Sequence, residues 1–416
     1  MFGVSDFLFF NSPAEWGDTF DILGDESFPE TDLVRRLISF GTEFGLSGNL
    51  WQQWLTYGLM MQENPFTLTC ERQKLSDGST LLQLAETDFR LFRELFFMDF
   101  AETDRRQLES LTRYQAPFAG YKKTEAGKRI AALSEKLAGA EDLKAFIELI
   151  TDHYAAYGTG IFGLYKAFRV AGGPSDLRLI PVTDSADVCF DDLIGLEEQK
   201  KTLKTNTEAF LNGLPANNVL LYGDSGTGKS TSVHALMHDY FDRGLRLVEI
   251  SKQDRRLLPQ VLASVKKRNY FFVIFLDDLS FEENESDYKE LKAMLEGALE
   301  KRSDRVLICA TSNRRHLIRE TWTDRSDMEY QNDIHRSDTM EEKLSLASRF
   351  GLSIYYSKPD AREYLHIVRE LSAREGIVMD EKDLNDAARK WELRHGGMTG
   401  RTASQLIAWL QGENQK

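Results

Sequence analysis

Cysteine is scarce in this chain of 416 residues, which holds only three, and no two of them form a C-x-x-C pair. Cys70, Cys189 and Cys309 lie far apart, which favours a reducing compartment over an exported, disulfide-stapled domain. No stretch reaches the roughly 18 uninterrupted apolar residues of a membrane helix. The first residues, MFGVSDFLFF, also lack the basic region of a signal peptide. We therefore expect a soluble, cytoplasmic protein that does not associate with membranes.

Basic charge is in deficit, since 52 Lys and Arg face 66 Asp and Glu and leave a net charge of −14. Such a chain is not suited to coating nucleic acid or anionic lipid by bulk electrostatics, although a local basic patch could still bind nucleic acid. Proline is also rare, with 9 residues, whereas 42% of the chain is apolar. This composition excludes collagen-like and disordered proteins and provides material for packed cores.

Helical periodicity dominates both ends of the chain. Through about residue 180, apolar residues recur at three- and four-residue steps, and Thr or Asp residues suited to capping precede several segments. Residues 171–187 then collect Gly, Pro, Ser and Asp, which is typical of a linker. The last stretch, from PDAREYLHIVRELSAREG onward, returns to the helical period. We therefore predict a mostly α-helical N-terminal domain at 1–180 and a helical lid at 358–416.

Between these helical regions the sequence predicts a parallel sheet. Short apolar runs alternate with helical stretches, as in a sheet that helices cover on both faces. The expected strands are NVLLY at 218–222, RLVEI at 246–250, FFVIFL at 271–276, VLICAT at 306–311 and LSIYY at 352–356. The fold class is therefore α/β, with this domain at 186–357.

The sharpest motif is GDSGTGKST at 223–231, which matches G-x-x-x-x-G-K-[ST]. A Gly-rich turn of this spacing lets successive backbone N–H groups surround a polyphosphate. It follows a predicted strand and precedes a predicted helix, as a phosphate loop requires. Lys229 is expected to contact the β- and γ-phosphates of ATP, and the Ser230 hydroxyl to hold Mg²⁺. The predicted nucleotide-binding residues are Gly223, Asp224, Ser225, Gly226, Thr227, Gly228, Lys229, Ser230 and Thr231.

A second motif, VIFLDDL, ends a buried strand in two adjacent carboxylates. We expect Asp277 to order Mg²⁺ through water beside the phosphate loop, and Asp278 to polarise the attacking water. The side chain of Asp278 is one methylene shorter than that of the Glu that many ATPases with a phosphate loop carry at this position. Glu282 or Glu283 could therefore contribute the base instead. The structural alternative is a surface turn after a core strand.

With these motifs, residues 186–416 resemble a module of the AAA+ ATPases, a branch of the P-loop NTPases. FDDLIG is similar to the segment before the phosphate loop in that superfamily, which implies that the backbone of Ile194 and Gly195 borders adenine. VLICATSNRR places Asn313 where the superfamily has a sensor residue that helps to orient the hydrolytic water. As a structural alternative, Asn313 would simply cap the next helix.

Two arginines extend the resemblance. SLASRFGLSIYY is similar to the arginine-finger box of the initiator and helicase-loader branch, which implies that Arg349 is the finger. A cation at a helix C-terminus would also be favourable for the helix dipole alone. MTGRTASQLI resembles the start of the second sensor helix, with Arg401 reaching the nucleotide. The long helical region joined to this module is also similar to a bacterial AAA+ family without an assigned biological function.

Two kinds of motor are not favoured by the local chemistry. Protein-threading members of the superfamily carry an aromatic–apolar–Gly tripeptide in the loop after the second strand, whereas this loop reads SKQDRRLLPQ. The acidic stretch SFEENESDYKE would repel a phosphate backbone, so a nucleic-acid partner is only weakly supported.

The combined prediction is a Mg²⁺-dependent AAA+ ATPase that couples its nucleotide state to remodelling or loading of an unidentified protein partner. The resemblance further implies a homo-oligomer in which Arg349 acts in trans on a neighbour's ATP. Two alternatives stay open: a protein that binds ATP to stabilise an assembly with negligible turnover, and a small-molecule P-loop kinase. Steady-state phosphate release tests the first, and phosphorylated product on substrate addition tests the second.

Overall fold

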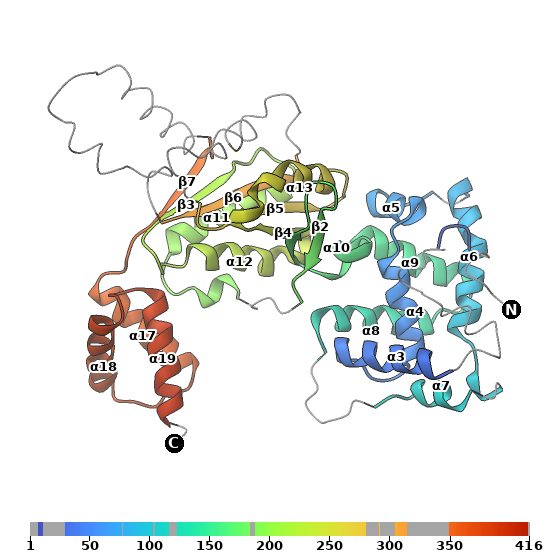
Figure 1. The fold of residues 1–416 in the computed structure, drawn as a ribbon, viewed down its shortest axis with the longest axis horizontal. Coiled ribbons are helices and arrows are strands. Elements are labelled where there is room, and N and C mark those ends of the chain that lie inside the picture. Colours follow the sequence, from blue (N-terminus) through green and yellow to red (C-terminus); the bar gives the residue numbers. More distant parts are fainter. Residues whose placement is uncertain are drawn as a thin grey trace, which may run out of the picture. The chain divides into compact units, whose positions relative to one another are not determined.

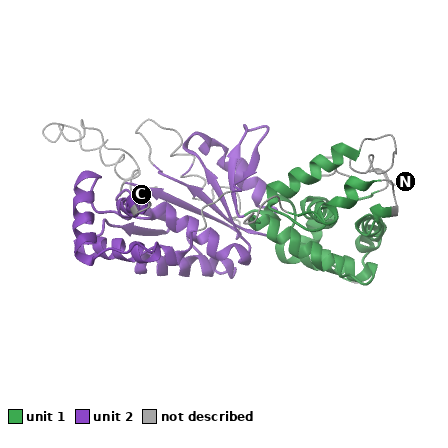
Figure 2. Ribbon diagram, turned by 90° about the horizontal axis from the view of Figure 1, so that it is seen from below, with its two compact units in different colours: residues 1–165 green, residues 166–416 purple. Residues whose placement is uncertain are grey.

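The computed structural model describes residues 7–10, 30–76, 78–102, 105–115, 123–183, 188–279, 291, 304–313 and 349–414. The chain divides into two compact units, Met1–Tyr165 and Lys166–Lys416, which Figure 2 draws in green and purple. Each unit has its own hydrophobic core.

Helices make up the first unit. They are α3 (Glu30–Phe44), α4 (Leu50–Met61), α5 (Pro65–Arg72), α6 (Thr80–Phe96), α7 (Arg106–Leu111), α8 (Glu125–Ala138), α9 (Leu143–Tyr157) and α10 (Gly160–Leu164), with a 3-10 turn, η2 (Phe100–Glu102). Side-chain caps define several starts: Asn64 and Thr67 form a capping box at α5, and Asp142 caps α9. The predicted helical character of this region is therefore present from Glu30 onward in the described residues.

The core of the first unit is rich in aromatic rings. Phe10 contacts Phe66, Phe89 and Phe92 edge-on, with ring centroids 5.3–6.3 Å apart. The buried carboxylate of Asp88 in α6 accepts hydrogen bonds from the backbone N–H groups of residues 8 and 9, at 2.9 and 2.7 Å. A charge-assisted contact thus fixes an apolar segment far away in the sequence.

A seven-stranded sheet forms the centre of the second unit (Figure 1). Its strands are β1 (Ala167–Ala171), β2 (Arg178–Pro181), β3 (Val219–Gly223), β4 (Leu245–Ile250), β5 (Phe271–Leu276), β6 (Val306–Ser312) and β7 (Leu352–Tyr356). They lie in the order β2-β1-β4-β5-β6-β3-β7, and every pair except β1–β2 is parallel. The five predicted strands are confirmed within one residue at either end, and the mostly parallel sheet confirms the predicted α/β fold class.

Apolar residues on both faces explain why these strands lie inside the unit. Val219, Val273 and Leu307 pack with residues of α11 (Glu197–Leu211) and α12 (Lys229–Tyr240) in one core. Leu220 and Ile274, which point to the opposite face, are buried as well. Further turns and helices in this part are η3 (Phe190–Asp192), η4 (Phe241–Arg243), η5 (Lys252–Leu257) and α13 (Leu258–Val265).

The boundary between the units differs from the predicted one. Residues 166–181 were expected to belong to the helical domain or to a linker, but β1 and β2 join the sheet at its edge. Phe168 of β1 pairs with Val248 of β4, and Arg169 reaches Glu249 at 3.4 Å. Each strand includes an arginine, Arg169 in β1 and Arg178 in β2, so neither is a continuous apolar run. The strand β4, which holds β1 in the sheet, lies far away in the sequence. The helical unit therefore ends at Tyr165 instead of residue 180.

Three helices complete the second unit, in the part of the chain for which the sequence predicts a helical lid. They are α17 (Ala361–Arg374), α18 (Glu381–Arg394) and α19 (Gly400–Asn414), drawn in red and orange in Figure 1. A core of their own contains Tyr364, Val368, Leu384 and Leu406. In the described part of the chain, no helix combines the length and the apolar content needed to cross a membrane.

Candidate nucleotide-binding site

The phosphate loop joins β3 to α12 at the carboxyl edge of the sheet. Gly223, with φ of +134°, lies against β7, where a side chain would collide with the carbonyl oxygen of Tyr356. The next backbone N–H, that of Asp224, donates to the same oxygen at 3.1 Å. Gly228 has φ of +94° and directly precedes α12. Only glycine adopts these conformations without strain, which accounts for the motif in terms of backbone geometry.

Lys229 begins α12 and is buried, with 6% of its surface exposed. Its Nζ donates to the carbonyl oxygens of Gly223 and Asp224, at 3.1 and 2.6 Å, and to Oδ1 of Asn313 at 2.9 Å. Burial lowers the pKa of this ammonium, and the carboxylates of Asp224, Asp277 and Asp278 oppose that shift. The structure thus places a cation at the start of α12. An anion bound there would meet both this cation and the backbone N–H groups of the helix N-terminus.

Ser230 and Asp277, the two residues predicted to hold Mg²⁺, lie in contact. The Ser230 hydroxyl donates to Oδ1 of Asp277 at 2.7 Å. Thr311 of β6 donates to the same carboxylate oxygen at 2.5 Å. Hydroxyl and carboxylate oxygens are the hard ligands that Mg²⁺ prefers. The donor set therefore fits the predicted metal.

Asp278 follows Asp277 and adopts a left-handed backbone conformation, with φ of +48°. Its backbone N–H donates to Oγ1 of Thr311 at 2.9 Å, and its Oδ1 accepts from Nδ2 of Asn313 at 2.9 Å. Since an ammonium can only donate and a carboxylate can only accept, the Asn313 amide has one chemically consistent orientation. Asn313 thus links Lys229 to Asp278.

These contacts follow from the strand order. β5, β6 and β3 are neighbours in the sheet, and the carboxyl ends of parallel strands meet at one edge. Asp278 and Asn313 are exposed there, while Lys229 is buried beneath them. The structure therefore brings together the predicted phosphate, metal and water-positioning residues.

Sequence reasoning missed two residues of this cluster. Thr311 belongs to the apolar run VLICATS, where a hydroxyl next to the strand that ends in DD was an available signal. Arg255 of η5 is nearly buried and donates from Nη2 to the carbonyl oxygens of Asp277 and Asp278, at 3.2 and 3.1 Å. The spacing of Arg255 from other motifs gives no comparable hint.

Arg401 lies beside the phosphate loop at the start of α19. Its backbone N–H donates to the Gly226 carbonyl oxygen at 3.3 Å, and its positive charge contributes to the lowered pKa of Lys229. Arg349 is exposed and lies in the turn that leads into β7. In the sheet, β7 is the neighbour of β3. Glu282 and Glu283, the alternative bases, lie outside the described residues.

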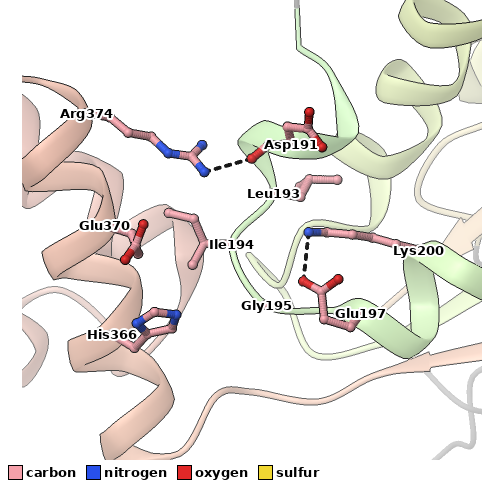
Figure 3. Close-up of a pocket in the computed structure, with 9 residues that line it drawn as sticks. All are labelled: Asp191, Leu193, Ile194, Gly195, Glu197, Lys200, His366, Glu370 and Arg374. Carbon is pink, nitrogen blue, oxygen red and sulfur yellow. Dashed lines mark hydrogen bonds and ion pairs between the residues drawn. The ribbon is translucent and has the colours of Figure 1, made fainter.

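A pocket of about 390 Å³ separates the lid from the segment before α11. Figure 3 shows the side chains of His366, Glu370 and Arg374 from α17 facing that segment. Arg374 donates to the carbonyl oxygen of Asp191 at 2.8 Å. The lining residues are Asp191, Leu193, Ile194, Gly195, Glu197, Lys200, His366, Glu370 and Arg374.

The two residues predicted to border adenine, Ile194 and Gly195, are thus on the wall of this pocket. The same segment reaches the phosphate loop, because Leu193 and Leu196 approach the position of a side chain on Gly228 at 3.5 and 3.2 Å. The segment from Leu193 to Leu196 therefore runs from the pocket to the phosphate loop.

Comparisons with known proteins found a matching family model and similar solved structures. Among solved structures, RuvB of Thermotoga maritima, described as a Holliday junction branch migration motor, is 18% identical with a TM-score of 0.35. A point mutant of that protein is 19% identical with a TM-score of 0.38. Each alignment covers 53% of this chain, and 63% and 64% of those chains, so the chain spans less than two thirds of either. Residues 164–414 match the model of a family described as "Protein of unknown function (DUF815)". Because this match covers more than half of the chain, the protein belongs to the DUF815 family.

Proposed function

We propose that the protein is a Mg²⁺-dependent ATPase of the AAA+ type. The observation that carries the proposal is the hydrogen-bonded cluster of Lys229, Ser230, Asp277, Asp278 and Asn313 at the carboxyl edge of β3, β5 and β6. These residues come from three separate motifs. Their hydrogen bonds hold the proposed phosphate-binding, metal-binding and water-orienting residues next to one another, as phosphoryl transfer requires.

The phosphates are proposed to occupy the turn before α12. Backbone N–H groups at the start of this helix offer donors and the positive end of the helix dipole. Lys229 adds a fixed charge, and its present acceptors are carbonyl oxygens of the loop itself. Phosphate oxygens are stronger acceptors for an ammonium than neutral carbonyls are. Lys229 is therefore expected to turn its donors toward the β- and γ-phosphates.

Ser230 and Asp277 would hold the Mg²⁺. When bound, the cation would offset the negative charge that develops on the β- and γ-phosphate oxygens. The Ser230 hydroxyl oxygen, which now donates to Asp277, would be a ligand of that cation, and Thr311 would keep the Asp277 carboxylate in place by its own hydrogen bond. This arrangement supports Asp277 as the residue that orients the metal.

Asp278 and Asn313 would orient the attacking water. Both side chains are exposed at the edge of the site, so water can reach them. The Asp278 carboxylate accepts the water's proton, while the Asn313 amide fixes the direction of that carboxylate through its present hydrogen bond. Arg401, next to Gly226, would add positive charge from the lid side.

The base of ATP is proposed to enter the pocket in Figure 3. Ile194 supplies an apolar surface and the backbone at Gly195 supplies polar groups, while His366 closes the pocket from α17. Arg374 connects α17 to Asp191 across the same pocket. Nucleotide occupancy would thus be communicated to the lid, and through the lid to an unidentified protein partner.

The direct test compares ATP binding and phosphate release in the wild-type protein and Lys229→Ala. The wild type should bind a fluorescent ATP analogue and release phosphate steadily when Mg²⁺ is present. Lys229→Ala should lose tight binding, because the phosphates lose the only side-chain cation that the loop supplies. Lys201→Ala, which removes an exposed lysine from α11, is the matched control and should behave as wild type.

Three results would contradict the proposal. Unchanged analogue affinity in Lys229→Ala would remove the phosphate-loop assignment. Binding by the wild type without turnover would favour an ATP-stabilised assembly protein. Phosphate transfer to an added small molecule, in place of release into water, would favour a kinase.

A further inference from the structure

Arg255 connects the loop after β4 with the residues that follow β5. It lies in η5, with 7% of its surface exposed, between the exposed Lys252 and the buried Leu257. One nitrogen of its guanidinium, Nη2, donates to two consecutive carbonyl oxygens, those of Asp277 and Asp278. The arginine therefore binds the main chain of the two residues that carry the carboxylates.

The main chain at this point needs such support. Asp278 is one of two described residues other than glycine with a positive φ, a left-handed conformation that is strained for most L-residues. Strained conformations of this kind persist where surrounding contacts determine them. Thr311 supplies two such contacts, accepting from the N–H of Asp278 and, through its carbonyl oxygen, from the N–H of Leu279 at 2.7 Å.

Thr311 and Arg255 bind opposite kinds of backbone group. Thr311 holds the N–H groups of the turn, whereas Arg255 holds its carbonyl oxygens. Together they fix the peptide planes on both sides of the Asp278 Cα atom, which sets the direction of its side chain toward Asn313. Without Arg255, two carbonyl oxygens would lose a charged donor, while the Thr311 contacts with the N–H groups would stay.

We infer that Arg255 is a positioning residue for Asp278, which it aims at the attacking water by holding the backbone of Asp277 and Asp278. This inference rests on the proposed function. It extends that function by assigning a role to the segment after β4, which none of the motifs in the sequence includes. A displacement of about 1 Å at a reacting group can cost on the order of 10²-fold in rate.

The experiment measures kcat, KM for ATP and melting temperature for Arg255→Met and Arg255→Lys. Methionine keeps the apolar stem but has no donor, so kcat should fall about tenfold or more, with KM within about threefold of wild type. Lysine restores one charged donor without the planar fork, so its kcat should lie between those of Arg255→Met and wild type.

Arg246→Met is the matched control. Arg246 is also a buried arginine whose guanidinium donates to two carbonyl oxygens, those of Phe241 and Leu245, but it lies at the opposite end of β4. This variant should lower the melting temperature and leave kcat within about twofold of wild type.

The inference is overturned if Arg255→Met keeps kcat within twofold of wild type, if KM rises in proportion as kcat falls, or if Arg246→Met lowers kcat as much. A second readout separates failure of the inference from failure of the proposed function. If the wild type binds a fluorescent ATP analogue but releases no phosphate, the ATPase proposal fails. The Mg²⁺ concentration that gives half-maximal binding then decides whether Arg255 holds the backbone of Asp277 and Asp278, since it should rise in Arg255→Met and remain unchanged in Arg246→Met.

Discussion

A backbone angle gives a physical reason for aspartate at position 278. The residue has φ of +48°, a region that Asp and Asn enter more readily than Glu does, because their short polar side chains can hydrogen-bond locally. Its Oδ1 makes such a contact with Asn313. A longer side chain would have to satisfy the same backbone and the same amide. The choice of Asp over Glu therefore fits the turn, and asparagine is a substitution that the turn should accept.

Another single residue, His153 in α9, predicts how stability depends on pH. It is buried, and burial lowers its pKa to about 3, with Arg129 and Lys136 adding to that shift. The native state therefore keeps His153 neutral, while the unfolded chain binds a proton below pH 6.5. The contribution of His153 to the free energy of unfolding is fully present above pH 6.5. It is lost as the pH falls from 6.5 toward 3, by about 1.4 kcal/mol per pH unit.

Denaturant unfolding of the full chain between pH 7 and 4.5 checks this. His153→Gln cannot titrate, so its free energy of unfolding should fall less steeply with decreasing pH than that of the wild type. If the free energy of unfolding fell equally with decreasing pH in the wild type and in His153→Gln, burial would not disfavour protonation of His153.

At the scale of elements, the sequence predicted the parts whose signal is local. The strands from β3 to β7 were predictable because each is a short apolar run between stretches whose sequence has helical periodicity. The phosphate loop was predictable because its glycines adopt positive φ angles, which are strained for other residues. These elements in turn determine which residues meet at the sheet edge.

Elements that depend on distant partners were not predictable in the same way. β1 and β2 are only five and four residues long, and β1 takes its place through pairing with β4. Arg255 is a comparable case at the site, since its acceptors are backbone carbonyls whose arrangement no side-chain pattern encodes. Tertiary contacts, not local periodicity, decide these positions.

At the scale of the whole molecule, the proposed mechanism requires more than one subunit. Arg349 is exposed before β7 and is proposed to complete the ATP site of a neighbouring copy. Arg349→Ala should then bind ATP normally and hydrolyse it about 10³–10⁵-fold more slowly. Activity per wild-type subunit should rise with protein concentration as the copies associate.

Mixing variants tests this trans arrangement. Arg349→Ala and Lys229→Ala are each expected to be nearly inactive, but mixed oligomers should contain sites with an intact loop from one copy and an intact arginine from the next. Phosphate release by the mixture should therefore exceed the sum of the separate activities. No such excess, in mixtures shown to form mixed oligomers, would leave Arg349 with a structural role only.

The central claim is that the carboxylates after β5 perform ATP hydrolysis beside the phosphate loop. Its most direct test is Asp278→Asn, with ATP binding and single-turnover hydrolysis measured on the same preparation. Asparagine keeps the size and the left-handed turn but cannot accept the water's proton. The account predicts Mg²⁺-dependent ATP binding close to wild type with hydrolysis slowed about 10²–10⁴-fold. Near-normal hydrolysis by Asp278→Asn would contradict it and transfer the role of the base to another residue, with Glu282 and Glu283 the first to be substituted.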